Sequence, residues 1–244
     1  MRIAVAGSTG LVGSHVVAAA EAAGHTVVGL ARETGIDFTS SAGLDDLLVG
    51  VEALVDVTNS PTMDLRAVEF FETVAANLGD AATRAGVART VVLSIIGVDR
   101  VPELDYYAAK VAQERTHRAH SPGVHILRAA QFHQFPGMAI GWGRDGGSTT
   151  VDDLVSQPVA VDEIARVLLE LATGAREDDL VELAGPRPEH IADLARRVIE
   201  HRDEQLTVIP REAPRSIRDG ALLPGPDAII AGPTFDEWLS RQSA

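Results

Sequence analysis

The residues best suited to chemistry are Tyr106 and Lys110, together with Ser94 upstream of them. Tyr106 and Lys110 are four residues apart, so on a helix both side chains lie on one face. A tyrosine phenol can donate a proton to a carbonyl oxygen while hydride reaches the carbon, and a nearby ammonium lowers the phenol pKa from about 10 towards neutral pH. Ser94 would hydrogen-bond the same oxygen. The pattern predicts an acid–base site for hydride transfer.

Lys110 is the only lysine of the chain, whereas a solvated surface normally carries several. This favours a specific role for it beside Tyr106. The alternative is that Tyr106 packs into the protein and Lys110 lies along the surface with its ammonium in water. Tyr107 faces elsewhere on the same helix and is expected in the core.

A glycine-rich loop near the start of the chain supplies the second chemical signal. It separates a predicted strand from a predicted helix, where glycines make the turn and let the backbone approach a pyrophosphate. The phosphates would then lie on the free N–H groups at the positive end of the helix. The alternative is a tight turn without a ligand. The loop consists of Gly7, Ser8, Thr9, Gly10, Leu11, Val12 and Gly13.

Arg32 and Glu33 follow the second predicted strand and bear on the choice of nicotinamide cofactor. An acidic side chain at this place binds the ribose 2′-OH of NAD, whereas an arginine accommodates the 2′-phosphate of NADP. Arg32 is in register at the strand end, which favours NADP(H), with NAD(H) as the alternative if Glu33 turns to the ribose. Both residues could also be solvated loop charges.

Alternating strands and helices must position these residues. Short apolar runs predict strands, and each is followed by a longer helical pattern, which is typical of right-handed crossovers. We therefore expect an α/β fold with a Rossmann-type doubly wound parallel sheet. The strands are expected at 2–6, 25–31, 53–57, 90–94 and 124–128, and the helices at 11–23, 61–85 (with Ser60 as N-cap and Pro61 in the first turn) and 105–119.

The pattern changes after about residue 130. We expect a mobile glycine-rich loop at 141–150, helices beginning near Asp162 and Ile191, an extended segment at 210–233 and a short helix at 234–240. The prediction is a single NAD(P)-binding domain over 1–244, with a nucleotide-binding core at 1–135 and a small C-terminal substrate lobe at 136–244.

Composition excludes several classes of protein. The 244 residues are 45% hydrophobic and 23% charged, as in an ordinary globular domain. The net charge of −14 argues against a nucleic-acid or anionic-membrane partner, because phosphate polymers require a basic surface. The absence of cysteine excludes thiolate and disulfide chemistry. No apolar run is long enough for a signal peptide or a membrane span, so a cytoplasmic protein is expected.

Together these motifs resemble the short-chain dehydrogenase/reductase superfamily, and more closely its atypical NmrA-like, NAD(P)H-binding branch. The resemblance covers about residues 1–175 and implies that the glycine loop holds the diphosphate, Arg32 the 2′-phosphate and Lys110 the nicotinamide ribose. It leaves a homodimer open as the assembly. It also implies that the adenine is bound by Asp37 and Phe38, that Thr58 and Asn59 line the ribose channel, and that Gln131 and Phe132 flank the nicotinamide.

Further candidates lie in the histidines and aromatic residues. His133 follows the last strand of the nucleotide-binding half and is either a substrate contact or a half-buried histidine. An apolar lid and core packing are equal alternatives for the apolar group beside it, which comprises Phe132, Phe135, Met138 and Trp142. His117 and His120 are expected to be surface histidines, and no metal site is expected because no third ligand accompanies them.

Three functions are compatible with these motifs. The first is an NADP(H)-dependent oxidoreductase that transfers hydride to a small carbonyl, quinone or similar acceptor, with Ser94, Tyr106 and Lys110 as catalytic residues. The second is a catalytically silent, NmrA-like NADP(H) sensor that meets a protein partner. The third is a nucleotide-sugar epimerase-like enzyme. The small C-terminal lobe argues against it, because sugar-nucleotide enzymes usually carry a larger one.

Overall fold

The computed structural model describes residues 1–243 and divides into two compact units. The first comprises Met1–Arg128 and Val161–Val181, and the second Ala129–Ala160 and Glu182–Ala244. The helix that begins at Val161 therefore groups with the first unit. The single-domain organisation, with its division near residue 135, stays a prediction.

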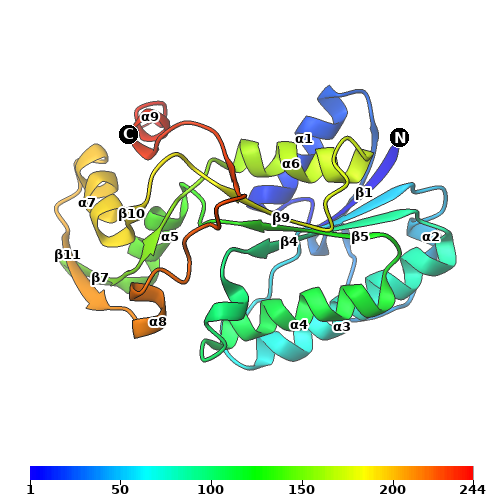
Figure 1. The fold of residues 1–244 in the computed structure, drawn as a ribbon, viewed down its shortest axis with the longest axis horizontal. Coiled ribbons are helices and arrows are strands. Elements are labelled where there is room, and N and C mark those ends of the chain that lie inside the picture. Colours follow the sequence, from blue (N-terminus) through cyan, green and yellow to red (C-terminus); the bar gives the residue numbers. More distant parts are fainter. Residues whose placement is uncertain (244) are drawn as a thin grey trace. The chain divides into compact units, whose positions relative to one another are not determined.

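A seven-stranded sheet of order β12-β9-β5-β4-β3-β1-β2 organises the chain and confirms the predicted α/β fold class (Figure 1). Its register brings the carboxyl ends of three strands to one level, because Ala6 pairs with both Leu30 and Asp56; Asp56 pairs with Val92, and that fourth strand continues to Ile95. Residues that follow these strands therefore meet at one edge. The strands are β1 (Arg2–Ala6), β2 (Thr26–Leu30), β3 (Ala53–Asp56), β4 (Arg89–Ile95), β5 (Val124–Ala129), β9 (Leu180–Ala184) and β12 (Ile229–Ile230).

Helices of the first unit cover both faces of its strands. The helix α1 packs against α6 on one face and α3 against α4 on the other (Figure 1). The central strands β1 and β3 are buried over almost their whole length and are mostly apolar, as parallel strands usually are, whereas the edge strand β2 is partly exposed. The helices are α1 (Leu11–Ala22), α2 (Leu44–Leu47), α3 (Arg66–Ala85), α4 (Asp105–His120) and α6 (Val161–Thr173), with short 3₁₀ turns η1 (Arg32–Thr34) and η2 (Val98–Arg100).

The second unit contains two small sheets, β11-β7-β6 and β10-β8. Its helices α5 and α7 pack on each other and on β7. Its remaining elements are α5 (Phe135–Gly143), β6 (Arg144–Asp145), β7 (Ser148–Asp153), β8 (Val155–Ser156), β10 (Glu189–His190), α7 (Ile191–His201), β11 (Thr207–Glu212), α8 (Arg215–Arg218) and α9 (Phe235–Leu239).

Two local predictions were wrong. The helix α3 begins at Arg66 rather than at Ser60–Pro61, because the Ser60 hydroxyl accepts the Thr62 N–H locally and Asp64 accepts that of Arg66. Residues 141–150 are not a loop throughout, since α5 runs to Gly143 and β7 begins at Ser148. A Cβ on Gly143 would lie 1.9 Å from the Thr150 carbonyl oxygen, so glycine there permits close packing rather than mobility.

Residues 210–233, predicted to be extended, include the end of β11, the helix α8 and β12. The predicted helix at 234–240 is confirmed as α9, whose first turn is capped by the Thr234 hydroxyl. Within residues 1–243 no helix is both long and apolar enough to cross a membrane.

A buried ion pair fixes α4 to the sheet of the first unit. Arg128 of β5 donates to Glu114 of α4 at 2.8 Å and 2.9 Å, and the two side chains are only 12% and 8% exposed. Arg128 also donates to Asp99 at 2.9 Å, but that carboxylate is 53% exposed, so removing the Glu114 charge leaves the buried guanidinium with a weaker, solvated anion.

We therefore expect Glu114→Gln to lower the free energy of unfolding by about 3 kcal/mol, measured by urea denaturation. The control is Glu72→Gln, which breaks the exposed pair with Arg115 on the same helix and should cost less than about 1 kcal/mol. Equal effects of the two substitutions would show that the Glu114–Arg128 pair has no special weight.

Candidate functional site

The glycine loop after β1 folds tightly over the ends of β2 and β3. Gly7 has a φ of +87°, and a Cβ there would lie 2.9 Å from the Val57 carbonyl oxygen. A Cβ on Gly13 would lie 2.0 Å from the Gly7 carbonyl oxygen. The Gly7 N–H donates to the Leu30 carbonyl at 2.8 Å. Both glycines are therefore required by backbone contacts, as the loop motif predicts.

The helix α1 begins from this loop without a side-chain cap. Its N-cap is Gly10, which has no side chain to accept the first N–H groups, and no acidic residue lies in its first turn. The first N–H groups of a helix have no intrahelical partner and carry the positive end of the helix dipole. The arrangement suits a phosphate group, as expected for Gly7 to Gly13.

Arg32 and Glu33 lie in η1, directly after β2, and both are exposed. The Thr9 hydroxyl of the glycine loop donates to the Glu33 carboxylate at 2.7 Å, and this hydrogen bond lowers the pKa of Glu33. Glu33 is thus tied to the loop, whereas Arg32 extends from the same turn as a cation. The structure brings both cofactor-selecting candidates to the loop that would hold the diphosphate.

Asp37 and Phe38, expected at the adenine, differ in their surroundings. Asp37 accepts bonds from the N–H and hydroxyl of Thr39, which lower its pKa. The Phe38 ring is 5% exposed and packs in the core with residues such as Leu30 and Leu44. The adenine role of both residues stays a prediction.

Tyr106, in the first turn of α4, donates its hydroxyl proton to Asn59 Oδ1 at 2.6 Å. Its ring packs edge to face on Phe71 of α3, with centroids 6.0 Å apart. Burial raises the pKa of Tyr106 to about 12. The predicted lowering by the ammonium of Lys110 is therefore wrong for this structure. At neutral pH Tyr106 is a proton donor held by an amide oxygen.

Lys110 is buried, with 5% of its side chain exposed, so the alternative of a surface lysine with a solvated head is wrong. Its Nζ donates to the Leu93 carbonyl at 2.8 Å and to the side-chain oxygen of Gln113. The ammonium also lies 4.7 Å from the centre of the Phe71 ring, on which Tyr106 packs as well. Burial lowers the pKa of Lys110 to about 8, while Asp56 and Glu114 oppose the shift.

Ser94 and Thr58 lie at neighbouring strand ends with unsatisfied hydroxyls. Asp56 and Val92 are paired between β3 and β4, and Thr58 and Ser94 lie two residues beyond them. The hydroxyl oxygens of Thr58 and Ser94 are buried without a hydrogen-bond partner. Buried polar groups normally have partners, so such atoms point to an unfilled polar site. Together with the glycine cradle, they fit a nucleotide cofactor bound at this edge of the sheet. Ser94 and Tyr106 are not in hydrogen-bond contact with each other.

Sequence reasoning missed a buried polar cluster beside Lys110. Asp56 is fully buried and accepts bonds of 2.8 Å from Gln113 Nε2, from His117 Nε2 and from the Thr58 N–H. Burial alone would raise the pKa of Asp56, but the hydrogen bond and charge of His117 and the bonds from Thr58 together outweigh it and hold the pKa well below its usual range. The expectation that His117 is a surface histidine was wrong, because Asp56 gives it a buried partner. The signal was the spacing of Lys110, Gln113 and His117 along one helical stripe.

Gln131 and Phe132, expected to flank the nicotinamide, lie in the second unit. The Gln131 side-chain oxygen accepts from the Ser156 hydroxyl, and Phe132 forms a backbone bridge with Val159. Both residues are thus held by the segment 156–159 of their own unit. Their role at a cofactor stays a prediction.

His133 is 1% exposed and packs on the C-terminal helix. Its ring lies 5.6 Å from that of Phe235 and 5.4 Å from that of Trp238. Nε2 donates to the Pro233 carbonyl at 3.1 Å, and burial lowers the pKa of the imidazole. The ring is therefore neutral, with Nδ1 as a buried acceptor without a partner. The substrate contact of His133 stays a prediction, and Nδ1 is the atom that would make it.

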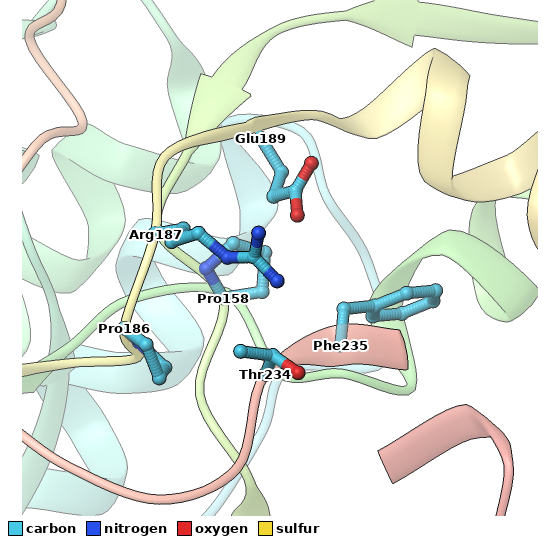
Figure 2. Close-up of a pocket in the computed structure, with 6 residues that line it drawn as sticks. All are labelled: Pro158, Pro186, Arg187, Glu189, Thr234 and Phe235. Atoms are coloured by element: carbon cyan, nitrogen blue, oxygen red, sulfur yellow. The ribbon is translucent and has the colours of Figure 1, made fainter. Parts of the chain in front are cut away.

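Two hollows lie within the second unit. In the first, the Arg187 side chain extends over Pro158 towards Thr234 and Phe235, and no room for a water molecule remains (Figure 2). The second has a volume of about 170 Å³ and is bounded by α5, β7, α7 and β11. Phe135 and Trp142 line it as an edge-to-face pair 5.8 Å apart. Of the predicted apolar group, Phe135 and Trp142 border this cavity, whereas Phe132 and Met138 do not line it.

Comparison with known proteins agrees with this fold. Residues 3–95 match the model of the NAD dependent epimerase/dehydratase family. No curated protein sequence matches the chain.

Three solved structures illustrate the likeness. MoeE5, in complex with UDP-glucose and NAD, is 18% identical with a TM-score of 0.76, and the match covers 99% of this chain and 97% of that chain. The NADPH-dependent quinone oxidoreductase QOR2 from Escherichia coli, complexed with NADPH, is 19% identical with a TM-score of 0.73 and 98% coverage of both chains. A dTDP-4-dehydrorhamnose reductase from Clostridium acetobutylicum is 17% identical, with a TM-score of 0.72 and coverage of 98% and 93%.

At these identities the likeness shows the fold alone.

The ionisation of Tyr106 is directly measurable because the chain has only two tyrosines. With the pKa of Tyr106 raised to about 12, its phenolate should be absent up to about pH 11 in the folded protein. The unfolded chain ionises near pH 10, so the stability that this burial contributes is present below pH 10 and is lost as the pH approaches 12. Ultraviolet difference titration of the wild type against Tyr106→Phe isolates the signal. Ionisation at or below pH 10 in the folded protein would contradict the burial effect.

Proposed function

We propose that the chain is an NADP(H)-dependent oxidoreductase of the short-chain dehydrogenase/reductase superfamily that reduces a small carbonyl, quinone or similar acceptor. Tyr106 is the proton donor, Ser94 hydrogen-bonds the acceptor oxygen and Lys110 binds the nicotinamide ribose. We further propose that the chain belongs to the NmrA-like branch. The net charge of −14 supports a small-molecule substrate over a nucleic acid.

The observation that carries the proposal is the protonated Tyr106 hydroxyl at the edge where the glycine loop lies. It donates to Asn59, which follows β3, the strand that pairs with β1 beneath the loop. An acid that is protonated at neutral pH, an uncapped helix N-terminus and the unsatisfied Ser94 hydroxyl all belong to the first unit. This combination is what reduction of a carbonyl requires.

The residues act in a defined order in the proposed reaction. A bound dihydronicotinamide supplies the hydride. Tyr106 releases Asn59 and transfers its proton to the substrate oxygen, which becomes a hydroxyl, and the phenolate is reprotonated from solvent. The Ser94 hydroxyl, otherwise without a partner, donates to the same oxygen and stabilises the charge that develops there.

The family match favours a second candidate. The matched region, residues 3–95, comprises the glycine loop and β1 to β4 and belongs to a model named for epimerases and dehydratases. In such an enzyme the nicotinamide would be recycled rather than consumed. Steady consumption of NADPH therefore distinguishes the reductase from the epimerase, and binding without turnover of any substrate distinguishes the sensor from both.

Replacing Tyr106 by Phe removes the proton donor and keeps the packing on Phe71. We expect a loss of about 10²- to 10⁴-fold in turnover, with NADPH affinity unchanged. The measurement is NADPH oxidation against a panel of quinones, aldehydes, ketones and nucleotide sugars, with fluorescence binding of NADPH on the same samples. Tyr107→Phe is the matched control on the same helix and should keep full activity. Equal turnover by the Tyr106 and Tyr107 variants would remove Tyr106 from the mechanism.

Replacing Arg32 by Ala tests the preference for NADP(H). Hydrogen bonds to a charged group contribute about 1.5–3 kcal/mol, so NADPH binding should weaken about ten- to a hundredfold while NADH binding changes little. The companion variant Glu33→Gln keeps the bond from Thr9 and should not weaken NADPH binding. If instead Arg32→Ala leaves NADPH binding unchanged and Glu33→Gln weakens NADH binding, the enzyme prefers NAD(H).

A further inference from the structure

The buried stripe of α4 forms one continuous chain of hydrogen bonds. From Lys110 it runs to Gln113, then to Asp56 of β3, and from Asp56 to His117. His117 in turn lies 2.8 Å from the Ser121 hydroxyl through Nδ1. The helical members are spaced by three or four residues, so they lie on one face and meet β3 and β4 together. The four residues Asp56, Lys110, Gln113 and His117 are each at most 5% exposed.

The carboxylate of Asp56 determines how the Gln113 amide is oriented. An ionised carboxylate only accepts hydrogen bonds, and Asp56 Oδ2 lies 2.8 Å from Gln113. The Gln113 NH₂ must therefore face Asp56, and the amide oxygen must face Lys110. A flipped amide would place two donors against the ammonium. The two charged neighbours, Asp56 and Lys110, thus fix the orientation of the Gln113 amide.

We propose that Gln113 is a positioning residue for Lys110, and that its amide, locked by Asp56, holds the lysine ammonium in place to bind the nucleotide ribose. The ribose contact rests on the proposed function, whereas the positioning of Lys110 does not. An ammonium has three donors, of which the Leu93 carbonyl and Gln113 take two. The third N–H is the one that would meet the ribose. Gln113 would therefore act on the ribose through Lys110.

The groups around Lys110 set the expected direction of change. Asp56 of β3 and Glu114 of α4 are the anions that oppose the effect of burial, and Tyr106 and Phe71 are neutral neighbours. His117 acts through Asp56. Gln113 accepts from the charged form of the lysine, so its removal lowers the pKa of Lys110 below its value of about 8.

The test uses the fact that Lys110 is the only lysine. Protein labelled with ¹⁵Nζ-lysine gives a single side-chain signal, whose pH titration and hydrogen exchange report on Lys110 without any cofactor. Gln113→Met keeps the size of the side chain and removes the acceptor, and we expect a lower pKa and faster exchange. Asp56→Asn offers the Gln113 NH₂ a competing donor and should give the same changes. Thr90→Val is the control, because Thr90 is equally buried on β4 and its hydroxyl has no partner.

NADPH binding is then measured on the same variants. We expect Gln113→Met and Asp56→Asn to weaken it about tenfold, the double variant to be no worse than either single variant, and Thr90→Val to bind as the wild type does. An Nζ titration and exchange rate in Gln113→Met and Asp56→Asn that match the wild type would overturn the positioning role. If the Nζ signal changes as expected but the wild type binds neither NADPH nor NADH, the positioning stands and the proposed function fails.

Discussion

The fully buried carboxylate of Asp56 is the constraint on which the first unit depends. A carboxylate without solvent requires donors for its oxygens, since an unpaired buried charge costs several kcal/mol. The Thr58 N–H supplies one from its own strand end, and Gln113 and His117 supply the others from α4. These bonds fix both the rotation and the height of α4 on the sheet. Tyr106 and Lys110, on the same helix, are placed as a consequence.

The glycine loop imposes a second constraint at the same edge of the sheet. Gly13 approaches the Gly7 carbonyl, and Gly7 approaches the Val57 carbonyl, so closely that no side chain fits at either position, which brings the start of α1 down onto the loop. The level ends of β1, β2 and β3 then place the residues that follow them beside the last residues of β4. Polar atoms without partners, Thr58 Oγ1 and Ser94 Oγ, lie at this edge. A site built from backbone N–H groups and unsatisfied hydroxyls is suited to a polar ligand rather than an apolar one.

The strands β1 to β5 and the glycine loop could be predicted because they depend on local patterns, whereas β9, β12 and the short strands of the second unit were not predicted. A continuous apolar run ending at Gly7 defines β1 whatever packs against it. The start of α3 could not be predicted in this way. The Ser60 hydroxyl can cap a helix or accept an N–H within a local turn, and only the tertiary structure selects the turn. Likewise His117 looks like a surface residue until β3 is known to pack on its face of α4. The direction of the pKa shift of Tyr106 depends on burial, which the spacing of residues alone does not reveal.

The raised pKa of Tyr106 also bears on the direction of the proposed chemistry. Reduction of a carbonyl consumes a proton at oxygen, whereas oxidation of an alcohol needs a base to accept one. An ordinary tyrosine, with a pKa near 10, is already protonated at neutral pH, and burial extends the protonated form of Tyr106 to higher pH. The same burial makes Tyr106 a weaker acid. In the proposed reaction its proton would therefore move only when an oxygen that gains negative charge replaces the Asn59 amide as its acceptor.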